Sequence, residues 1–174
     1  ECLTGALPVH MHNNIGNYES KSMTVMVGGT FDPLHDGHKR LLDRSFSIAG
    51  PCGYVVIGLT TDTFASRKIH PIRPFKTRKE ELERYIADNR YQASCRIEPL
   101  NDRFGSATDA DFDAIVVSEE TLPVAVEINK RRKDNNRKKV DIHQISCVLA
   151  EDGRWISSTR IYRGEIDVHG HLMH

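Results

Sequence analysis

The segment from Val25 to His38 (VMVGGTFDPLHDGH) most constrains how this chain can fold. A short run with β-branched residues ends at Gly28 and Gly29, where the absence of Cβ lets the backbone turn sharply. After the turn, apolar residues recur at the 3.6-residue period of a half-buried helix that begins at about His38. The segment therefore predicts a strand, a glycine-lined turn and a helix.

His35 and His38 stand three positions apart, at or just before the N-terminus of this helix. Unpaired backbone N–H groups and the helix dipole attract anions at such a terminus. The turn and its two imidazoles therefore predict a phosphate site. Two histidines could also bind zinc, but no third ligand is evident in the sequence, so a zinc site is disfavoured.

Strand and helix patterns alternate along the rest of the chain. Strands are expected at 24–27, 54–59, 95–100, 114–117 and 140–149, and helices at 38–49, from 77, from 121 or 123, and from 157 or 158. This order predicts an α/β fold, a Rossmann-like doubly wound parallel sheet of about five strands with helices on both faces. Ligands of such sheets bind beyond the carboxyl ends of the strands, which is where the glycine turn lies.

The stretch 60–75 is polar and basic and contains two prolines, so it is expected to be a loop that is well placed to close over a substrate. Thr77, followed three residues later by Glu80, predicts a capping box at the start of the next helix.

The chain is expected to form one domain, residues 23–174, preceded by an extension, residues 1–22. The extension mixes His, Asn, Gly and Ser without the apolar run of a secretory signal. It is expected to be flexible, with Met23 as the native start, and an ordered arm is the alternative.

Composition limits the possible partners. Lys+Arg and Asp+Glu both number 24, so net charge points to neither nucleic acid nor a membrane. The basic run 130–133 with 137–139 lies at an expected helix C-terminus and is interpreted as a solvated face. The four cysteines are far apart and form no C-x-x-C, which favours free thiols in a reducing compartment and a cytoplasmic location.

Further polar stretches could join the site. Ser118 and Glu119 directly follow an expected strand, and the loop 66–70 is basic. Near the C-terminus three consecutive hydroxyl residues, Ser157 to Thr159, precede Arg160. Helix capping would explain one hydroxyl, but three of them beside an arginine are suited to polyphosphate.

Two of these stretches resemble known signatures. Residues 29–38 resemble the T-x-F-D-x-x-H-x-G-H signature of the nucleotidyltransferase superfamily, and residues 156–159 resemble its I-S-S-T signature. Within the superfamily the chain is most similar to the phosphopantetheine adenylyltransferases of archaeal and eukaryotic type, on the stretches 56–60, 111–121 and 149–167. The resemblance departs at Tyr162, where a basic residue is expected.

The resemblance implies transfer of the adenylyl group of ATP to 4′-phosphopantetheine, giving dephospho-coenzyme A and pyrophosphate in coenzyme A biosynthesis. The attacking phosphate is already an anion, so positioned donors are needed rather than a strong base. Mg²⁺ is expected on the triphosphate, held by phosphate and water and by no protein side chain. The implied partners are these two small substrates, without nucleic acid or membrane.

The resemblance also implies the site residues. His38 is expected to contact the α-phosphate during transfer, His35 the triphosphate, and Lys68 (with Arg67 as the rival) the incoming phosphate. The expected ATP-binding residues are Gly28, Gly29, Thr30, Phe31, His35, His38, Ser118, Glu119, Ile156, Ser157, Ser158, Thr159 and Arg160. The expected phosphopantetheine-binding residues are Thr30, Asp32, Lys68 and Arg78.

Other functions remain open at this point. Nicotinamide mononucleotide or flavin mononucleotide could be the acceptor, or the chain could be a nucleotide sensor without turnover. Cytidylyl transfer to a polar-lipid precursor is disfavoured. Cytidylyltransferases usually carry an R-T-x-G-I-S-T-T stretch, whereas this chain has RWISST at 154–159.

Overall fold

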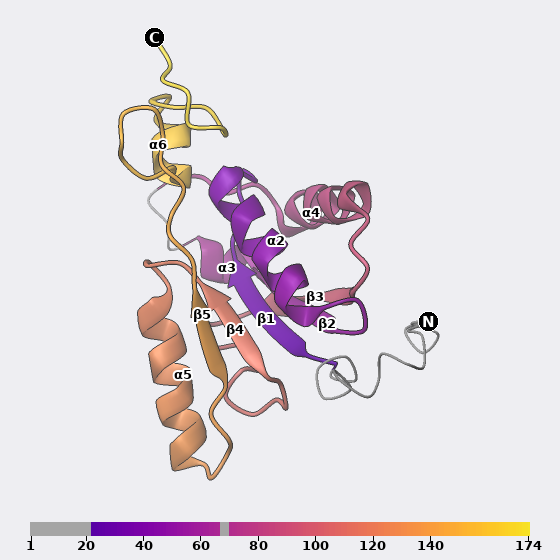
Figure 1. Cartoon of the computed structure of the whole chain (residues 1–174). Coiled ribbons are helices and arrows are strands. Elements are labelled where there is room, and N and C mark those ends of the chain that lie inside the picture. The colour runs from indigo at the N-terminus through magenta and orange to yellow at the C-terminus, as the bar shows by residue number, and fades with distance from the viewer. Residues whose placement is uncertain (1–21, 67–69) are drawn as a thin grey trace.

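A computed structural model describes residues 22–66 and 70–174 (Figure 1). The strands are β1 (Thr24–Gly29), β2 (Tyr54–Thr60), β3 (Ser94–Leu100), β4 (Ala114–Val117) and β5 (Asp141–Gln144). The helices are α2 (Asp36–Ala49), α3 (Asp62–Ala65), α4 (Phe75–Asn89), α5 (Leu122–Asp134) and α6 (Ser158–Tyr162).

The five strands form one parallel sheet in the order β3-β2-β1-β4-β5. The strand order reverses at β1, which pairs with β2 on one side and β4 on the other. Alternate residues of β1 enter different cores: Val25 packs with α2 and α4 on one face, and Met26 packs with α5 on the other. The predicted Rossmann-like α/β fold is confirmed, and its switch point lies at the glycine turn.

Several predicted boundaries move. β1 continues to Gly29, and α2 begins at Asp36 rather than His38. The predicted capping box at residues 77 and 80 is wrong, because α4 already begins at Phe75 after Pro74. Proline has a fixed φ and no N–H to satisfy, so a helix readily begins beside it.

The last strand is shorter than the predicted 140–149. β4 ends at Val117, whose carbonyl accepts a hydrogen bond from the Ile145 N–H at 2.8 Å. Beyond Ile145 the chain therefore has no residue of β4 beside it to continue the ladder of hydrogen bonds, and β5 ends at Gln144. The predicted loop 60–75 contains the short helix α3, capped by the Thr61 hydroxyl. The predicted extension 1–22 lies, except for Ser22, outside the described residues.

The interpretation of the basic run as a solvated face is wrong for one of its members. Arg132 is only 3% exposed, and its guanidinium points into the protein beneath the loop between β3 and β4. Its neighbours Arg131 and Lys133 are exposed, as expected.

A small C-terminal unit stands on the carboxyl edge of the sheet. Its core is Ala150, Ile156 and Ile166, and it carries α6 (Figure 1). The chain after α6 passes over the start of α2, where the Val168 carbonyl accepts the Asp36 N–H at 3.0 Å. Within the described part of the chain, no helix combines the length and apolar character needed to span a membrane.

Candidate functional site

The two histidines of the glycine turn cap helix α2. His35 is the N-cap residue, and its Nδ1 accepts the N–H groups of Gly37 at 3.0 Å and His38 at 3.3 Å. In return, Nδ1 of His38 accepts the His35 N–H at 3.3 Å. This is the reciprocal arrangement of a capping box, which has the same i, i+3 spacing as the H-x-G-H segment.

These hydrogen bonds fix the tautomers of both rings. Backbone N–H groups are donors, so Nδ1 of each imidazole is an acceptor and the ring proton lies on Nε2. The rings stack at 3.7 Å between centroids, and burial lowers the pKa of His35 to about 4. His35 is therefore a neutral Nε2–H donor at physiological pH.

Phe31 shapes the turn between β1 and α2. Its backbone lies in the left-handed region with φ of 51°, and its ring is buried 5.0 Å from that of His38. A Cβ on Gly29 would lie 3.3 Å from the Phe31 ring, so the glycine allows the aromatic ring to fold back. A non-glycine residue in this conformation is unusual and occurs more often at functional sites.

Thr30 is held by two elements beyond the turn. Its hydroxyl accepts that of Thr60 at 2.9 Å, and its carbonyl accepts Nη1 of Arg78 at 3.1 Å. Arg78 has no solvent exposure, and its other donors bond to the Arg73 carbonyl and the Asp62 carboxylate. The geometry does not support the prediction that Arg78 binds phosphate directly; instead, Arg78 supports Thr30.

Asp32 is the centre of a buried network. Its carboxylate accepts the backbone N–H and Nε of Arg73 and the hydroxyl of Tyr162. Arg73 in turn forms a two-pronged ion pair with Glu81. Burial alone would raise the pKa of Asp32, but the hydrogen bonds from Tyr162 and Arg73 outweigh it and leave the pKa below its usual value. Asp32 is therefore an ionised carboxylate, and its partners among the described residues are Arg73 and Tyr162.

Sequence reasoning missed the roles of Arg73 and Tyr162. Tyr162 stood out only as a departure from the expected basic residue. Burial and the bond to Asp32 raise the pKa of its phenol to about 12, so it remains a donor. Because Tyr162 lies in α6, its bond joins the second signature segment to the first. Its ring also stacks on His70 at 4.5 Å.

The hydroxyl triplet opens α6. Ser157 is the N-cap residue, and its hydroxyl accepts the Arg160 N–H at 3.3 Å, while Ser158 and Thr159 form the first turn and are half-buried. Ile156 points into the small C-terminal core and is 5% exposed, so its side chain does not face the site.

The predicted ATP contact of Arg160 is not supported by its surroundings. Arg160 is only 8% exposed, and its guanidinium bonds to Asp152, Glu165 and the Trp155 carbonyl. The hydrogen bonds from Arg160 lower the pKa of Asp152 to about 2, so the pair stays ionised. Arg160 ties the C-terminal unit together, a role that its place beside three hydroxyl residues does not reveal.

Ser118 and Glu119 lie in the turn between β4 and α5, at the carboxyl edge next to β1. The Ser118 N–H donates to the Thr121 hydroxyl at 3.1 Å, and the Glu119 carboxylate accepts the Cys147 N–H at 3.4 Å. Lys68 and its rival Arg67 lie outside the described residues. In the described part of the chain, no three His, Cys, Asp or Glu side chains gather as a metal site.

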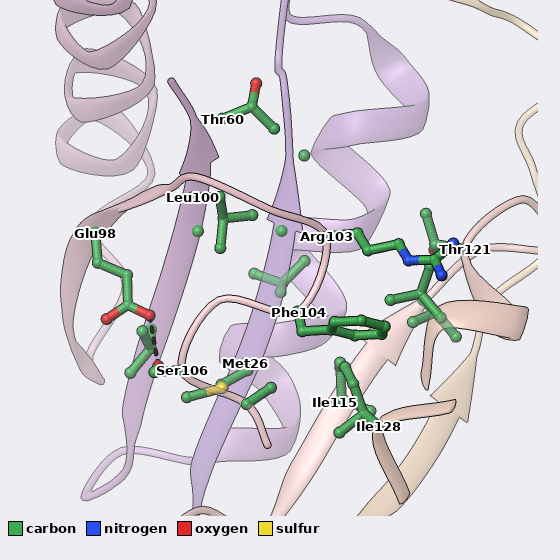
Figure 2. A pocket seen from close by; sticks show the side chains of 18 of the residues that line it. Met26, Thr60, Glu98, Leu100, Arg103, Phe104, Ser106, Ile115, Thr121 and Ile128 are labelled. Carbon is green, nitrogen blue, oxygen red and sulfur yellow. Dashed lines mark hydrogen bonds between the residues drawn. The ribbon is translucent and has the colours of Figure 1, made fainter. Parts of the chain in front are cut away.

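A cavity of about 460 Å³ extends from the turn along the sheet face opposite α2. It starts at Gly28, Gly29 and Thr30, and its floor is made by apolar residues of the sheet such as Met26 and Ile115. Figure 2 shows its other walls, which come from α5 and from the loop that carries Arg103, Phe104 and Ser106. Pockets of this size and mainly apolar lining hold small organic ligands.

The chain is similar to known proteins over most of its length. Residues 26–164 match the cytidylyltransferase-like family. The chain is 40% identical to a phosphopantetheine adenylyltransferase of Archaeoglobus fulgidus over 87% of its own length and 100% of the relative. It is 47% identical to that of Methanothermobacter thermautotrophicus over 88% of its length and 91% of the relative. A crystal structure of an Archaeoglobus fulgidus protein with unknown function is 36% identical, with a TM-score of 0.65, over 71% of this chain and 89% of that one.

Proposed function

The chain belongs to the cytidylyltransferase-like family and, within it, to the phosphopantetheine adenylyltransferases, and on that premise we propose how its residues perform the reaction. The enzyme is a nucleotidyltransferase of coenzyme A biosynthesis, which transfers the adenylyl group of ATP to 4′-phosphopantetheine. The products are dephospho-coenzyme A and pyrophosphate.

The reaction makes one P–O bond and breaks another. A phosphate oxygen of phosphopantetheine attacks the α-phosphorus of ATP, and the bond from that phosphorus to the bridging oxygen of pyrophosphate breaks. The nucleophile is already an anion, so no proton has to be removed. The barrier comes from bringing two anions together and from charge on the α-phosphate and the leaving group, which positioned donors can stabilise.

The observation that carries the assignment of roles is the pair of histidines in the capping box. Each imidazole uses Nδ1 for the backbone and carries its proton on Nε2. We assign His38 to the α-phosphate during transfer and His35 to the triphosphate. Because the backbone fixes both tautomers, neither ring has to reorganise when charge develops, which is the condition for efficient electrostatic stabilisation.

The hydroxyls of Ser157, Ser158 and Thr159 are assigned to the β- and γ-phosphates. Support comes from the bond of Tyr162 to Asp32, which ties α6 to the turn that holds the histidines. Magnesium enters with ATP as part of the substrate, and it would neutralise triphosphate charge. Gly28, Gly29, Thr30 and Phe31 lie where backbone and hydroxyl groups can meet the phosphates.

The adenosine of ATP and the pantetheine arm of the acceptor are assigned to different places. The turn at Ser118 and Glu119 is proposed to lie beside the adenosine. The pantetheine arm is proposed to enter the cavity under the loop after β3, because the cavity begins at Gly28–Thr30, where the phosphates react. Lys68 remains our candidate for the cation on the incoming phosphate. We propose ATP and phosphopantetheine as the only partners. A cytoplasmic location is proposed because its reducing conditions keep thiols free, as the three cysteines of the described residues are.

Purified full-length protein, incubated with magnesium and ATP and assayed for pyrophosphate, tests the proposal. Release is expected with 4′-phosphopantetheine and not with nicotinamide mononucleotide or flavin mononucleotide. Release with another acceptor alone would overturn the substrate, and release with none would favour a nucleotide sensor.

A further inference from the structure

The loop between β3 and β4, residues 101–113 and here called the roof loop, covers one side of the cavity. Arg103, Phe104, Ser106 and Ala107 of this loop line it (Figure 2). The loop contains no strand and no helix, so contacts outside its own backbone must set its height above the sheet. The reaction chemistry assigned above uses none of its residues.

Arg132 of α5 holds the middle of the roof loop. Its Nη1 donates to the carbonyls of Ala107 at 2.9 Å and Ala110 at 2.7 Å, and its Nε donates to the Lys138 carbonyl at 2.7 Å. Its guanidinium lies 5.0 Å from the centroid of the Phe112 ring. One side chain therefore contacts two carbonyls and one ring of the same loop.

This burial is costly, and it is not explained by an ion pair. Among the described residues no carboxylate lies within ion-pair distance of Arg132, and burial lowers the pKa of its guanidinium. Hydrogen bonds from a charged donor to carbonyls offset the lost hydration only when their geometry is good. Nη1 alone bonds both roof-loop carbonyls, and Nε adds the bond to Lys138 that anchors the guanidinium, whereas a lysine offers one nitrogen and would lose this anchor.

The first part of the roof loop is fixed separately. The Asp102 carboxylate accepts the N–H groups of Phe104 at 2.9 Å and Gly105 at 2.8 Å, and the Ser106 hydroxyl donates to Glu98 on β3 at 2.8 Å. The Asp102 bonds close a turn within the loop, and the Ser106 bond holds the loop to its own strand, β3. Arg132 bonds the carbonyl of Ala107, which lines the cavity, to the opposite wall, and Arg131 of the same helix lies 4.3 Å from the centroid of the Phe104 ring. Arg132 therefore helps to set the width of the cavity.

We propose that Arg132 is a positioning residue for the acceptor substrate, because it holds the roof loop at the height that the pantetheine arm requires. The proposal rests on the proposed function, which puts that arm in the cavity. Arg132 does not line the cavity itself, so it acts through the loop. Its loss should weaken acceptor binding, while the phosphate-binding turn keeps its own contacts with Thr60 and Arg78.

The test compares three variants of the full-length enzyme by steady-state pyrophosphate release. Arg132→Met keeps the length of the side chain and removes the donors, Arg132→Lys keeps the charge without the fork, and Lys133→Met removes a neighbouring exposed charge as the control. For Arg132→Met the KM for phosphopantetheine should rise about tenfold or more, because acceptor binding must then order a loop that has lost its charge-assisted hydrogen bonds. The KM for ATP should stay within about twofold, Arg132→Lys should show a smaller rise, and the control should match the wild type.

Hydrogen exchange of the roof loop gives a second readout. If Arg132→Met does not fold, Arg132→Lys decides, with hydrogen exchange of the amides 104–110 expected to be faster than in the wild type and that of α2 unchanged. Equal rises in both KM values, or an unchanged KM for phosphopantetheine, would overturn the role of Arg132. A wild-type enzyme that releases no pyrophosphate with phosphopantetheine would instead overturn the proposed function.

Discussion

Replacing His35 by Asn is expected to change how stability depends on pH while keeping the cap of α2. Asparagine is a favoured N-cap residue and can accept the same N–H groups, but it does not titrate. In the folded chain burial lowers the pKa of His35 to about 4, whereas an unfolded histidine titrates near 6.5. Between these values the unfolded state binds a proton that the folded state does not.

The sign and size follow from this difference. The unfolded state binds more protons below about pH 6.5, so the free energy of unfolding falls as the pH falls toward 4. Each pH unit within this window corresponds to about 1.4 kcal/mol, so His35 should cost the wild type about 2 kcal/mol between pH 7 and pH 5. His35 is only 7% exposed, so little of this is lost to solvent screening.

Urea unfolding of both proteins at pH 7 and pH 5 measures the effect. The wild type should lose about 2 kcal/mol more than His35→Asn over this range. Thr61→Asn, which changes the N-cap residue of α3 without removing a titratable group, serves as the control and should keep the pH dependence of the wild type. If the wild type and His35→Asn lose the same stability, His35 is not a neutral buried cap and the assigned tautomer is wrong.

Three other changes have defined outcomes. His38→Ala should still bind ATP by calorimetry while turnover falls by about a hundredfold, as when a transition-state donor is lost, and near-normal turnover would remove it from the mechanism. Tyr162→Phe should lower the free energy of unfolding by about 1 kcal/mol, because Asp32 loses a donor, and urea unfolding would refute this if stability were unchanged. Gly58→Ala should lower the free energy of unfolding by about 1–3 kcal/mol, because the new Cβ would lie 2.7 Å from Cγ of Leu100. Calorimetry should show a lower melting temperature, and a melting temperature equal to that of the wild type would contradict the tight packing.

The sequence predicts best what depends on neighbours in the chain. The strand, turn and helix around Gly28 and His38 follow from local periodicity, and the alternation of elements predicts the parallel sheet. The hydroxyls of the second signature also open a helix as expected. Even so, the sequence does not reveal that His35 and His38 cap α2, because capping boxes are ordinarily sought among Ser, Thr, Glu and Gln.

What the sequence does not predict depends on contacts between distant residues. Asp32 bonds to Arg73, 41 positions away, and to Tyr162, 130 positions away. Arg132, Arg78 and Arg160 stand in polar stretches that resemble surface, yet each is buried against backbone carbonyls. No periodicity distinguishes a buried arginine from a solvated one, because the partners lie on other elements.

The hydrogen bond from Tyr162 to Asp32 has a consequence for synthesis of the chain. The ribosome makes the histidine turn early and Tyr162 130 residues later. At 5–20 residues per second this delay is roughly 7 to 26 seconds, far longer than a helix needs to form. The Val168 carbonyl that caps Asp36 emerges later still. A nascent chain can therefore pair β1 with β2 well before the proposed nucleotide site is complete, and we expect activity only when its C-terminal unit closes over the turn.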